Sequence, residues 1–274
     1  RRKDVAGCLE LADKALDDTG LTAAATDFVA HALACAAEAK ASGKADAKLA
    51  RWRDRAAARL RKIIDDPASP MSIDDRSDAM DTIRELDQAA GRTADATAIS
   101  ERQRAMLDRA AAEAPTPIAA MTYNWHRCEV YEFLQRPLEL VPALEKSARD
   151  LPTEYDPRYR LGWLYYHAYL QADARADKPT PEQARAKATA LMQAARWTDE
   201  ALRLVYGPRK AKVLGLRADI ADRQGNPAAR RMLLQEIVRL WDSLPPGQAN
   251  PEAREEARKA LEAAEAAEAH AAKP

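Results

Sequence analysis

Residues 155–169 read YDPRYRLGWLYYHAY, and within them Leu161, Gly162 and Tyr165 form the pattern Leu-Gly-x-x-Tyr. An earlier tyrosine, Tyr131, precedes Tyr165 by 34 residues. Self-similarity at a fixed period of about 20 to 50 residues is the sequence sign of a repeat architecture, in which every repeat is one supersecondary unit. This stretch therefore predicts a stack of similar units along the chain.

The pattern and its period resemble those of the tetratricopeptide-repeat (TPR) family, in which each repeat is a hairpin of two helices. Counted from Tyr155, Leu161, Gly162 and Tyr165 occupy the seventh, eighth and eleventh positions of a repeat. The resemblance implies that Gly162 lies where the two helices of one hairpin come closest.

The preceding repeat, counted from Met121, has Tyr131 at position eleven and Pro152 at the closing proline position. Cys128 takes the small-residue slot of the same repeat. Weaker matches involve Ala218, Ala221 and Gly225, then Gly91 and Ala96, and finally a hairpin around Gly20.

Composition favours an all-α fold throughout. Alanine, the strongest helix former, is abundant, whereas the chain has 9 glycines and 2 phenylalanines. Proline- and glycine-containing breakers divide the chain into about twelve helical segments, which predicts a TPR-like solenoid of α-hairpins with a right-handed superhelical course. We expect residues 1–66 to form a degenerate hairpin region and residues 67–274 to form TPR-like repeats ending in a capping helix, together one continuous solenoid.

Charge and hydropathy limit the classes of partner. Lys plus Arg and Asp plus Glu number 43 each, so the formal net charge is zero. Because proteins that follow a phosphate backbone usually carry a basic excess, this balance predicts that nucleic acid is not a partner. No apolar run approaches the roughly 18 residues that a membrane span needs, so no membrane insertion is expected.

The sequence has few motifs that would indicate catalysis or cofactor binding, so we expect neither an enzymatic activity nor a cofactor. The acidic stretch Asp74-Asp75-Arg76-Ser77-Asp78 matches the DDxxD spacing with which all-α prenyl-diphosphate and terpene synthases bind magnesium. Those enzymes need a second acidic motif, which the sequence lacks, and Ser72 makes the same acids a capped first turn of a helix. A magnesium enzyme built on Asp74, Asp75 and Asp78 is the least favoured alternative.

Two pairs of potential metal ligands lie one helical turn apart, His31 with Cys35 and His126 with Glu129. A zinc site wants three or four ligands, so both pairs are interpreted as ordinary helix residues. Three widely separated cysteines, Cys8, Cys35 and Cys128, cannot form a closed disulfide framework.

Aromatic residues give the sharpest functional hypothesis, because ten of the 15 fall between Tyr123 and Tyr169. In TPR proteins the first helix of each hairpin lines the concave surface, and the resemblance projects one set of side chains into that groove. This predicted partner-binding set is Trp125, His126, Phe133, Tyr159, Arg160, Trp163, Tyr166 and His167. The alternative is that the rings pack against neighbouring helices, since aromatics are mostly core residues.

The favoured interpretation is a scaffold that binds a protein or peptide, with an unspecified oligomeric state. A rival interpretation is an accessory helical domain of a larger exported bacterial protein. The proline-punctuated hairpins and the segment around Tyr206-Gly207-Pro208 resemble helical regions that follow a thioredoxin domain. Since the chain starts at Arg1 without a methionine, it is expected to be a processed product or a piece of a longer protein. Its compartment is then the cytoplasm or, for a processed fragment, the periplasm.

Overall fold

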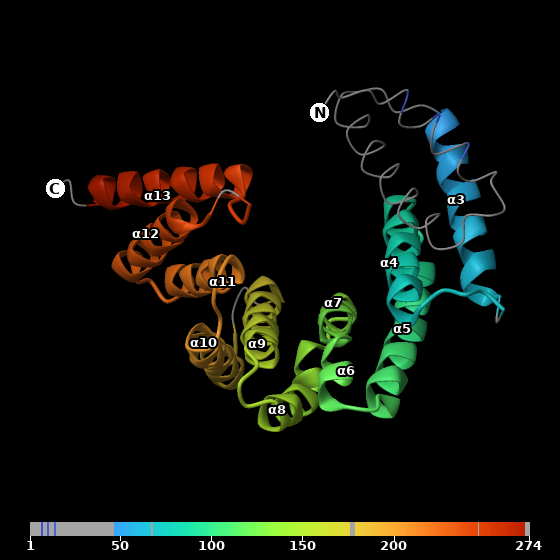
Figure 1. The fold of residues 1–274 in the computed structure, drawn as a ribbon, viewed down its shortest axis with the longest axis horizontal. Coiled ribbons are helices and arrows are strands. Elements are labelled where there is room, and N and C mark those ends of the chain that lie inside the picture. The colour runs from blue at the N-terminus through green and yellow to red at the C-terminus, as the bar shows by residue number, and fades with distance from the viewer. Residues whose placement is uncertain are drawn as a thin grey trace. The chain divides into compact units, whose positions relative to one another are not determined.

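The computed structural model of the chain describes residues 47–66, 68–175, 179–245 and 247–271, together with Gly7, Glu10 and Lys14. Within these residues the regular structure is entirely helical, without a β-strand, so the predicted all-α array of helical hairpins is confirmed. The chain divides into two compact units, residues 1–113 and 114–274. The boundary expected after residue 66 falls inside the first unit and stays a prediction. Figure 1 shows the course of the helices.

The described part of the first unit contains α3 (Ala47–Asp65), α4 (Ile73–Ala89) and α5 (Thr93–Glu113). Its core is formed by apolar side chains from all three helices, including Leu60, Ile64, Ile83, Leu86 and Ile99. Gly91 joins α4 to α5 with a positive φ of 74°, a conformation that glycine adopts without a steric penalty. The hairpin predicted around Gly91 is thereby found.

The acidic stretch after Ser72 forms the start of α4. The backbone N–H of Asp75 donates to Ser72 Oγ at 3.0 Å, and the Ser72 N–H donates to the Asp75 carboxylate at 3.3 Å. This reciprocal pair is a capping box, which satisfies two backbone donors that the helix itself leaves unused. Asp74 and Asp75 also lie at the positive end of the helix dipole. The arrangement gives these acids a structural role in helix initiation.

The described part of the second unit contains seven longer helices and two short ones, in the following order along the chain. They are α6 (Pro117–Met121), α7 (Asn124–Phe133), the 3-10 helix η1 (Pro137–Leu140), α8 (Val141–Asp150), α9 (Asp156–Arg175), α10 (Pro181–Leu202), α11 (Arg209–Arg223), α12 (Pro227–Ser243) and α13 (Pro251–Ala271). α9 packs mainly on α10, α11 on α12, and α13 on α12 (Figure 1). Consecutive pairs thus form hairpins, and α13 follows the last of them.

The hairpin of α9 and α10 has its closest approach at Gly162, as the resemblance implied. A Cβ placed on Gly162 would overlap Thr198 Oγ1 and would lie 3.2 Å from the Thr198 backbone nitrogen and 3.3 Å from the Ala194 carbonyl oxygen. Thr198 is fully buried, and its hydroxyl donates to Ala194 O at 2.7 Å. Only a residue without a side chain allows the two backbones to lie this close.

The remaining hairpin of the second unit and the last helix begin and end with local signals that the sequence carries. Gly225, at φ 66°, joins α11 to α12. Asn226 Oδ1 accepts from the Ala229 N–H at 3.0 Å, and Asn250 Oδ1 accepts from the Glu252 N–H at 3.0 Å. Each asparagine precedes a proline that begins the helix, where the missing N–H costs nothing.

The repeat counted from Met121 departs from the expected hairpin. Its first helix, α7, begins at Asn124, and the chain turns at Gln135 with φ 62°. Pro137 and Pro142 lie in the following segment, so its second helix starts with the 3-10 turn η1 before α8. α7 packs on η1 and α9, and α8 packs on α9. Cys128 nevertheless fills a fully buried position, as a small-residue slot requires.

Gly162→Ala should lower the free energy of unfolding by about 1–3 kcal/mol, because the added methyl group must separate α9 from the backbone of α10. Urea denaturation followed by circular dichroism measures the loss.

The matched control is Gly215→Ala, in the interior of α11, where an added Cβ meets nothing within 4 Å. Alanine favours a helix over glycine by about 0.5–1 kcal/mol, so this variant should be as stable as the wild type or more stable. Equal stability of the two alanine variants would refute the close approach at Gly162.

Candidate functional site

Side chains from three helices that are distant in sequence meet on one face of the second unit, which we call the α7–α9–α11 face. It is defined by Trp125 on α7, by Arg160, Trp163, Tyr166 and His167 on α9, and by Lys212 on α11. α7, α9 and α11 are the first helices of successive hairpins, so the hairpin order itself brings these residues together.

Trp163 is the central ring of this face. Its centroid lies 3.8 Å from that of His167, in a stacked arrangement, and 6.5 Å from that of Trp125, with the planes tilted by 57°. Tyr166 meets His167 edge-on at 6.2 Å. His167 Nδ1 lies 3.4 Å from a carboxylate oxygen of Glu132 on α7. The stacked and edge-on geometries are those that aromatic pairs prefer, so the rings hold one another in place.

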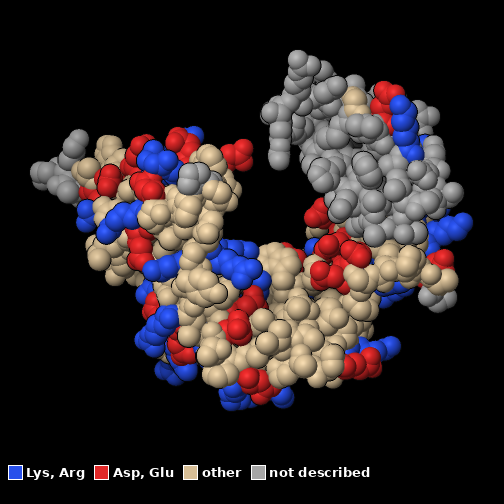
Figure 2. Space-filling view, in the orientation of Figure 1, with Lys and Arg blue, Asp and Glu red and all other residues tan. Residues whose placement is uncertain are grey.

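Two cations lie beside Trp125. The guanidinium carbon of Arg160 is 4.5 Å from the centroid of the Trp125 ring, and the Lys212 ammonium is 4.3 Å from it. Both also lie within 6 Å of the Tyr159 ring, at 5.1 and 5.7 Å. Cations attract the electron-rich faces of aromatic rings, most strongly that of tryptophan. Figure 2 shows Lys and Arg side chains gathered over α9 and α11 in this region.

Asp156, at the start of α9, is the carboxylate of this cluster. One of its oxygens lies 3.0 Å from Arg160 Nη2, and only 17% of its side chain is exposed. Burial raises the pKa of Asp156 above its ordinary value, although the charge of Arg160 and a hydrogen bond from Asn124 act in the opposite direction. Burial likewise raises the pKa of the Tyr159 hydroxyl, to about 12.

The other end of the face has a different charge pattern. Arg223 of α11 is hydrogen-bonded to the Tyr166 hydroxyl, whose pKa is raised by burial and lowered by this bond. Asp219, one turn earlier on α11, has a pKa raised by burial. This end therefore combines an aromatic hydroxyl with both a cation and a carboxylate.

Most of the predicted groove residues lie on the α7–α9–α11 face, but Tyr159 does not. Trp125, Arg160, Trp163, Tyr166 and His167 are partly buried and belong to the α7–α9–α11 face. Tyr159 touches the same cations, but it is only 4% exposed and lies in the core between α9, α10 and α11.

His126 is buried on α7, and Phe133 is partly buried near the end of that helix. The contacts that define the α7–α9–α11 face are those of Trp125, Arg160, Trp163, Tyr166, His167 and Lys212. The role of His126 and Phe133 in binding stays a prediction.

Sequence reasoning missed Lys212, although it lies at the centre of the cluster. Asp156 takes the second position of the Tyr155 repeat, which the resemblance places on the concave surface. Lys212 belongs to the run Arg209-Lys210-Ala211-Lys212, which follows Pro208 and begins α11. Three cations in the first turn of a helix are unusual, because acidic residues are favoured there. That anomaly was the available signal.

Of the three cysteines, Cys128 lies among the described residues, and it is buried. Burial raises the pKa of the Cys128 thiol, which keeps it neutral. Cys8, Cys35 and His31 lie outside the described residues. No helix in the described ranges has the length and apolar character required to cross a membrane.

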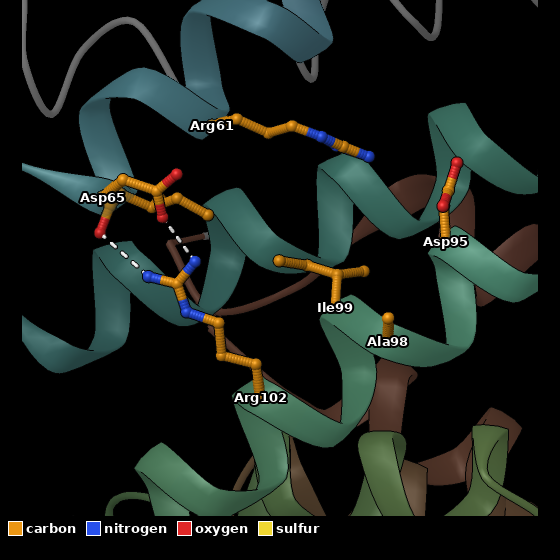
Figure 3. A pocket seen from close by; sticks show the side chains of 7 residues that line it. Arg61, Asp65, Asp95, Ala98, Ile99 and Arg102 are labelled. Carbon is orange, nitrogen blue, oxygen red and sulfur yellow. Dashed lines mark hydrogen bonds and ion pairs between the residues drawn. The ribbon is translucent and has the colours of Figure 1, made fainter.

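A cavity of about 350 Å³ lies in the first unit, between α3 and α5 (Figure 3). Two arginines line it, and each already has a carboxylate partner. Arg102 forms an ion pair with Asp65 and donates a hydrogen bond to the Ile64 carbonyl oxygen (dashed lines in Figure 3), and Arg61 pairs with the fully buried Asp87. The charges of both arginines are therefore neutralised by carboxylates of the same unit.

No known protein family matches the sequence, and no curated protein is similar to it. The solved structures that match this chain include two of IFIT1. The human IFIT1 dimer with m7Gppp-AAAA has a TM-score of 0.42 and 13% identity, over 77% of this chain and 46% of that chain. A monomeric IFIT1 mutant with Gppp-AAAA has a TM-score of 0.45 and 13% identity, over 83% of this chain and 48% of that chain. The chain thus spans about half the length of either structure.

The prediction that nucleic acid is not a partner, which rests on the zero net charge, is wrong. Both similar structures are complexes with capped RNA. In this chain, moreover, Arg160 and Lys212 lie together beside Trp125 although the formal net charge is zero. A zero sum over a whole chain does not prevent cations from gathering at one site. The resemblance to helical regions that follow a thioredoxin domain finds no support in these similarities.

Asp156→Asn tests the electrostatics of the cluster. Because the pKa of Asp156 is raised in the folded protein, ionisation of this carboxyl costs stability. The free energy of unfolding of the wild type, relative to Asp156→Asn, should therefore be highest below about pH 4 and should fall as the pH is raised to 7. Urea denaturation at a series of pH values measures this difference.

Asp173→Asn is the control with the opposite sign. Asp173 is exposed, and its ion pair with Lys187 lowers its pKa. Wild type should gain stability relative to this variant as the pH rises to about 4, and the gain should be small because the pair is exposed. The same pH dependence for both variants would contradict the burial of Asp156.

Proposed function

We propose that this chain is a helical-repeat scaffold that binds an extended segment of a partner protein on the α7–α9–α11 face. Trp163 and Tyr166 are the anchors of this binding, with Trp125 and His167 beside them. Partly exposed aromatic side chains that are held in place by neighbours make good anchors, because they offer a large contact area and lose little conformational freedom on binding.

The observation that carries the proposal is the division of aromatic side chains between the two sides of α9. Trp163 and Tyr166 turn towards α7 and α11, since their partners are Trp125, His167 and Arg223. Tyr165 instead lies near Glu145 of α8 and Arg196 of α10, whose charges act on its hydroxyl. All three rings are partly buried and pack against the same core cluster, so the two groups differ in the neighbours that they face.

The length of the face suits an extended segment rather than a small molecule. Its contacts come from three first helices in succession, over α7, α9 and α11. Arrays of stacked hairpins characteristically use such extended surfaces for binding. A scaffold of this kind needs no catalytic group, and the proposal assigns none.

A random dodecapeptide library displayed on phage, selected against the full chain, should yield binders. Trp163→Ala and Tyr166→Ala should each weaken a selected peptide at least about tenfold, measured by fluorescence anisotropy, because truncation of an anchor commonly costs about 2 kcal/mol. Each variant should lower the free energy of unfolding by less than Tyr165→Ala does.

Tyr165→Ala is the contrasting variant. It should lower the free energy of unfolding by about 2–3 kcal/mol through the cavity left between hairpins, while the peptide affinity of the folded fraction stays within about twofold. If Trp163→Ala and Tyr165→Ala destabilise equally and neither changes peptide affinity, the rings serve packing alone and the proposal fails.

A further inference from the structure

The first turn of α11 carries three cations, of which one is paired. Lys210 Nζ lies 2.7 Å from a carboxylate oxygen of Glu236 on α12. Arg209 and Lys212 are exposed, and neither forms an ion pair with any of the residues that the structure describes. They lie three positions apart in the helix, so their side chains emerge on the same side. Two cations are therefore presented together, neither of them in an ion pair with a carboxylate of the described residues.

These cations lie towards α9. The positive charge of Arg209 acts on the hydroxyl of Tyr155, directly before α9, and the Lys212 ammonium lies over the Trp125 and Tyr159 rings. Arg209 and Lys212 thus extend the α7–α9–α11 face at the start of α11. Together with Arg160 they give this end of the face three cations interleaved with aromatic rings.

The arrangement is electrostatically unfavourable in the absence of an anion. The N-terminal turn of a helix already carries partial positive charge from its free N–H groups, so cations there are repelled. α11 has no acidic residue in its first turn and no side-chain cap to offset this. Burial and the charge of Arg160 lower the pKa of Lys212, although Glu129 and Asp156 act in the opposite direction. A bound carboxylate would offset each of these penalties.

Glu129 and Asp156 lie close enough to act on Lys212, and the other carboxylates of the face lie further from the start of α11. Glu132 faces His167, Asp219 lies further along α11, and Asp156 is already bonded to Arg160. The face is therefore cationic at the start of α11 and mixed or acidic beyond it. A segment that confines its negative charge to one end and is apolar or aromatic elsewhere is complementary to this pattern.

We propose that the segment bound by the α7–α9–α11 face is an acidic peptide, whose carboxylates bind Arg209 and Lys212 while its apolar side chains contact Trp163 and Tyr166. This inference rests on the proposed function and specifies the chemistry of the partner. Arg160 lies 4.5 Å from the centroid of the Trp125 ring and 3.0 Å from Asp156, and it is a positioning residue.

The test compares the peptides that three proteins select from the random dodecapeptide library. The full wild-type chain and Lys210→Gln should enrich sequences with at least about twice the Asp and Glu content of the input. The double variant Arg209→Gln/Lys212→Gln should still select peptides with apolar residues, but without this acidic enrichment. Lys210→Gln removes one charge from the same turn, so it separates the loss of net charge from the loss of the two unpaired cations.

A selected acidic peptide is then measured by anisotropy, beside its version with Gln and Asn in place of Glu and Asp. The acidic form should bind the wild type about tenfold more tightly, as charge-assisted hydrogen bonds allow, and the preference should vanish in the double variant. Circular dichroism establishes that the variants keep the helical fold.

Three results would overturn the inference in distinguishable ways. Selection of peptides without acidic preference, with loss of binding in Trp163→Ala, leaves the proposed function standing and removes the acidic specificity. Failure to select any peptide removes both. Tighter binding of single-stranded oligouridylate than of the acidic peptide, with loss in the double variant, would assign Arg209 and Lys212 to nucleic acid instead.

Discussion

The close approach of α9 and α10 at Gly162 is the constraint on which the second unit depends. There is no room for a side chain between Gly162 and the backbone of Thr198 and Ala194. With the two helices held at this distance, Tyr159 and Leu216 pack with Ala194 and Ala195 in the core that joins α9, α10 and α11. The rotation of α9 about its own axis is fixed by this contact, and that rotation decides which side chains face α7 and α11.

The candidate site follows from that rotation because α9 is helical throughout. With about 3.6 residues per turn, Trp163, Tyr166 and His167 share one side of the helix, while Leu161 and Tyr165 lie on others. The side that faces α7 and α11 meets Trp125 and Lys212, so the packing of one hairpin creates the aromatic and cationic face. The core and the candidate site are thus two sides of the same helix.

Much of the fold could be read from the sequence, because its signals are local. Glycine at a positive φ, asparagine before proline, and Ser72 three residues before Asp75 each determine a turn or a helix end through contacts within a few residues. Gly162, the small residue of the Leu-Gly-x-x-Tyr pattern, predicted the close contact between the two helices. The interruption of the hairpin after α7 could not be predicted from the sequence, because Pro137 and Pro142 are each compatible with a turn or with the start of a helix.

The electrostatics of the site could not be read in the same way. The sequence gives charges one by one, and their sum of zero hides the gathering of Arg160 and Lys212 around Trp125, which requires α9 and α11 to lie side by side. The burial of Tyr159 was equally beyond reach, because position alone put it in the groove, whereas the packing of three helices decides its exposure.

The central claim is that partners bind on the side of α9 that faces α7 and α11. Fluorine NMR of the chain labelled with 5-fluorotryptophan tests this directly, since Trp125 and Trp163 lie on that face, whereas Trp197 is buried on α10 and Trp241 lies on α12. Addition of a selected peptide should shift the Trp125 and Trp163 resonances and leave those of Trp197 and Trp241 in place. A shift confined to Trp197 or Trp241 would contradict the account.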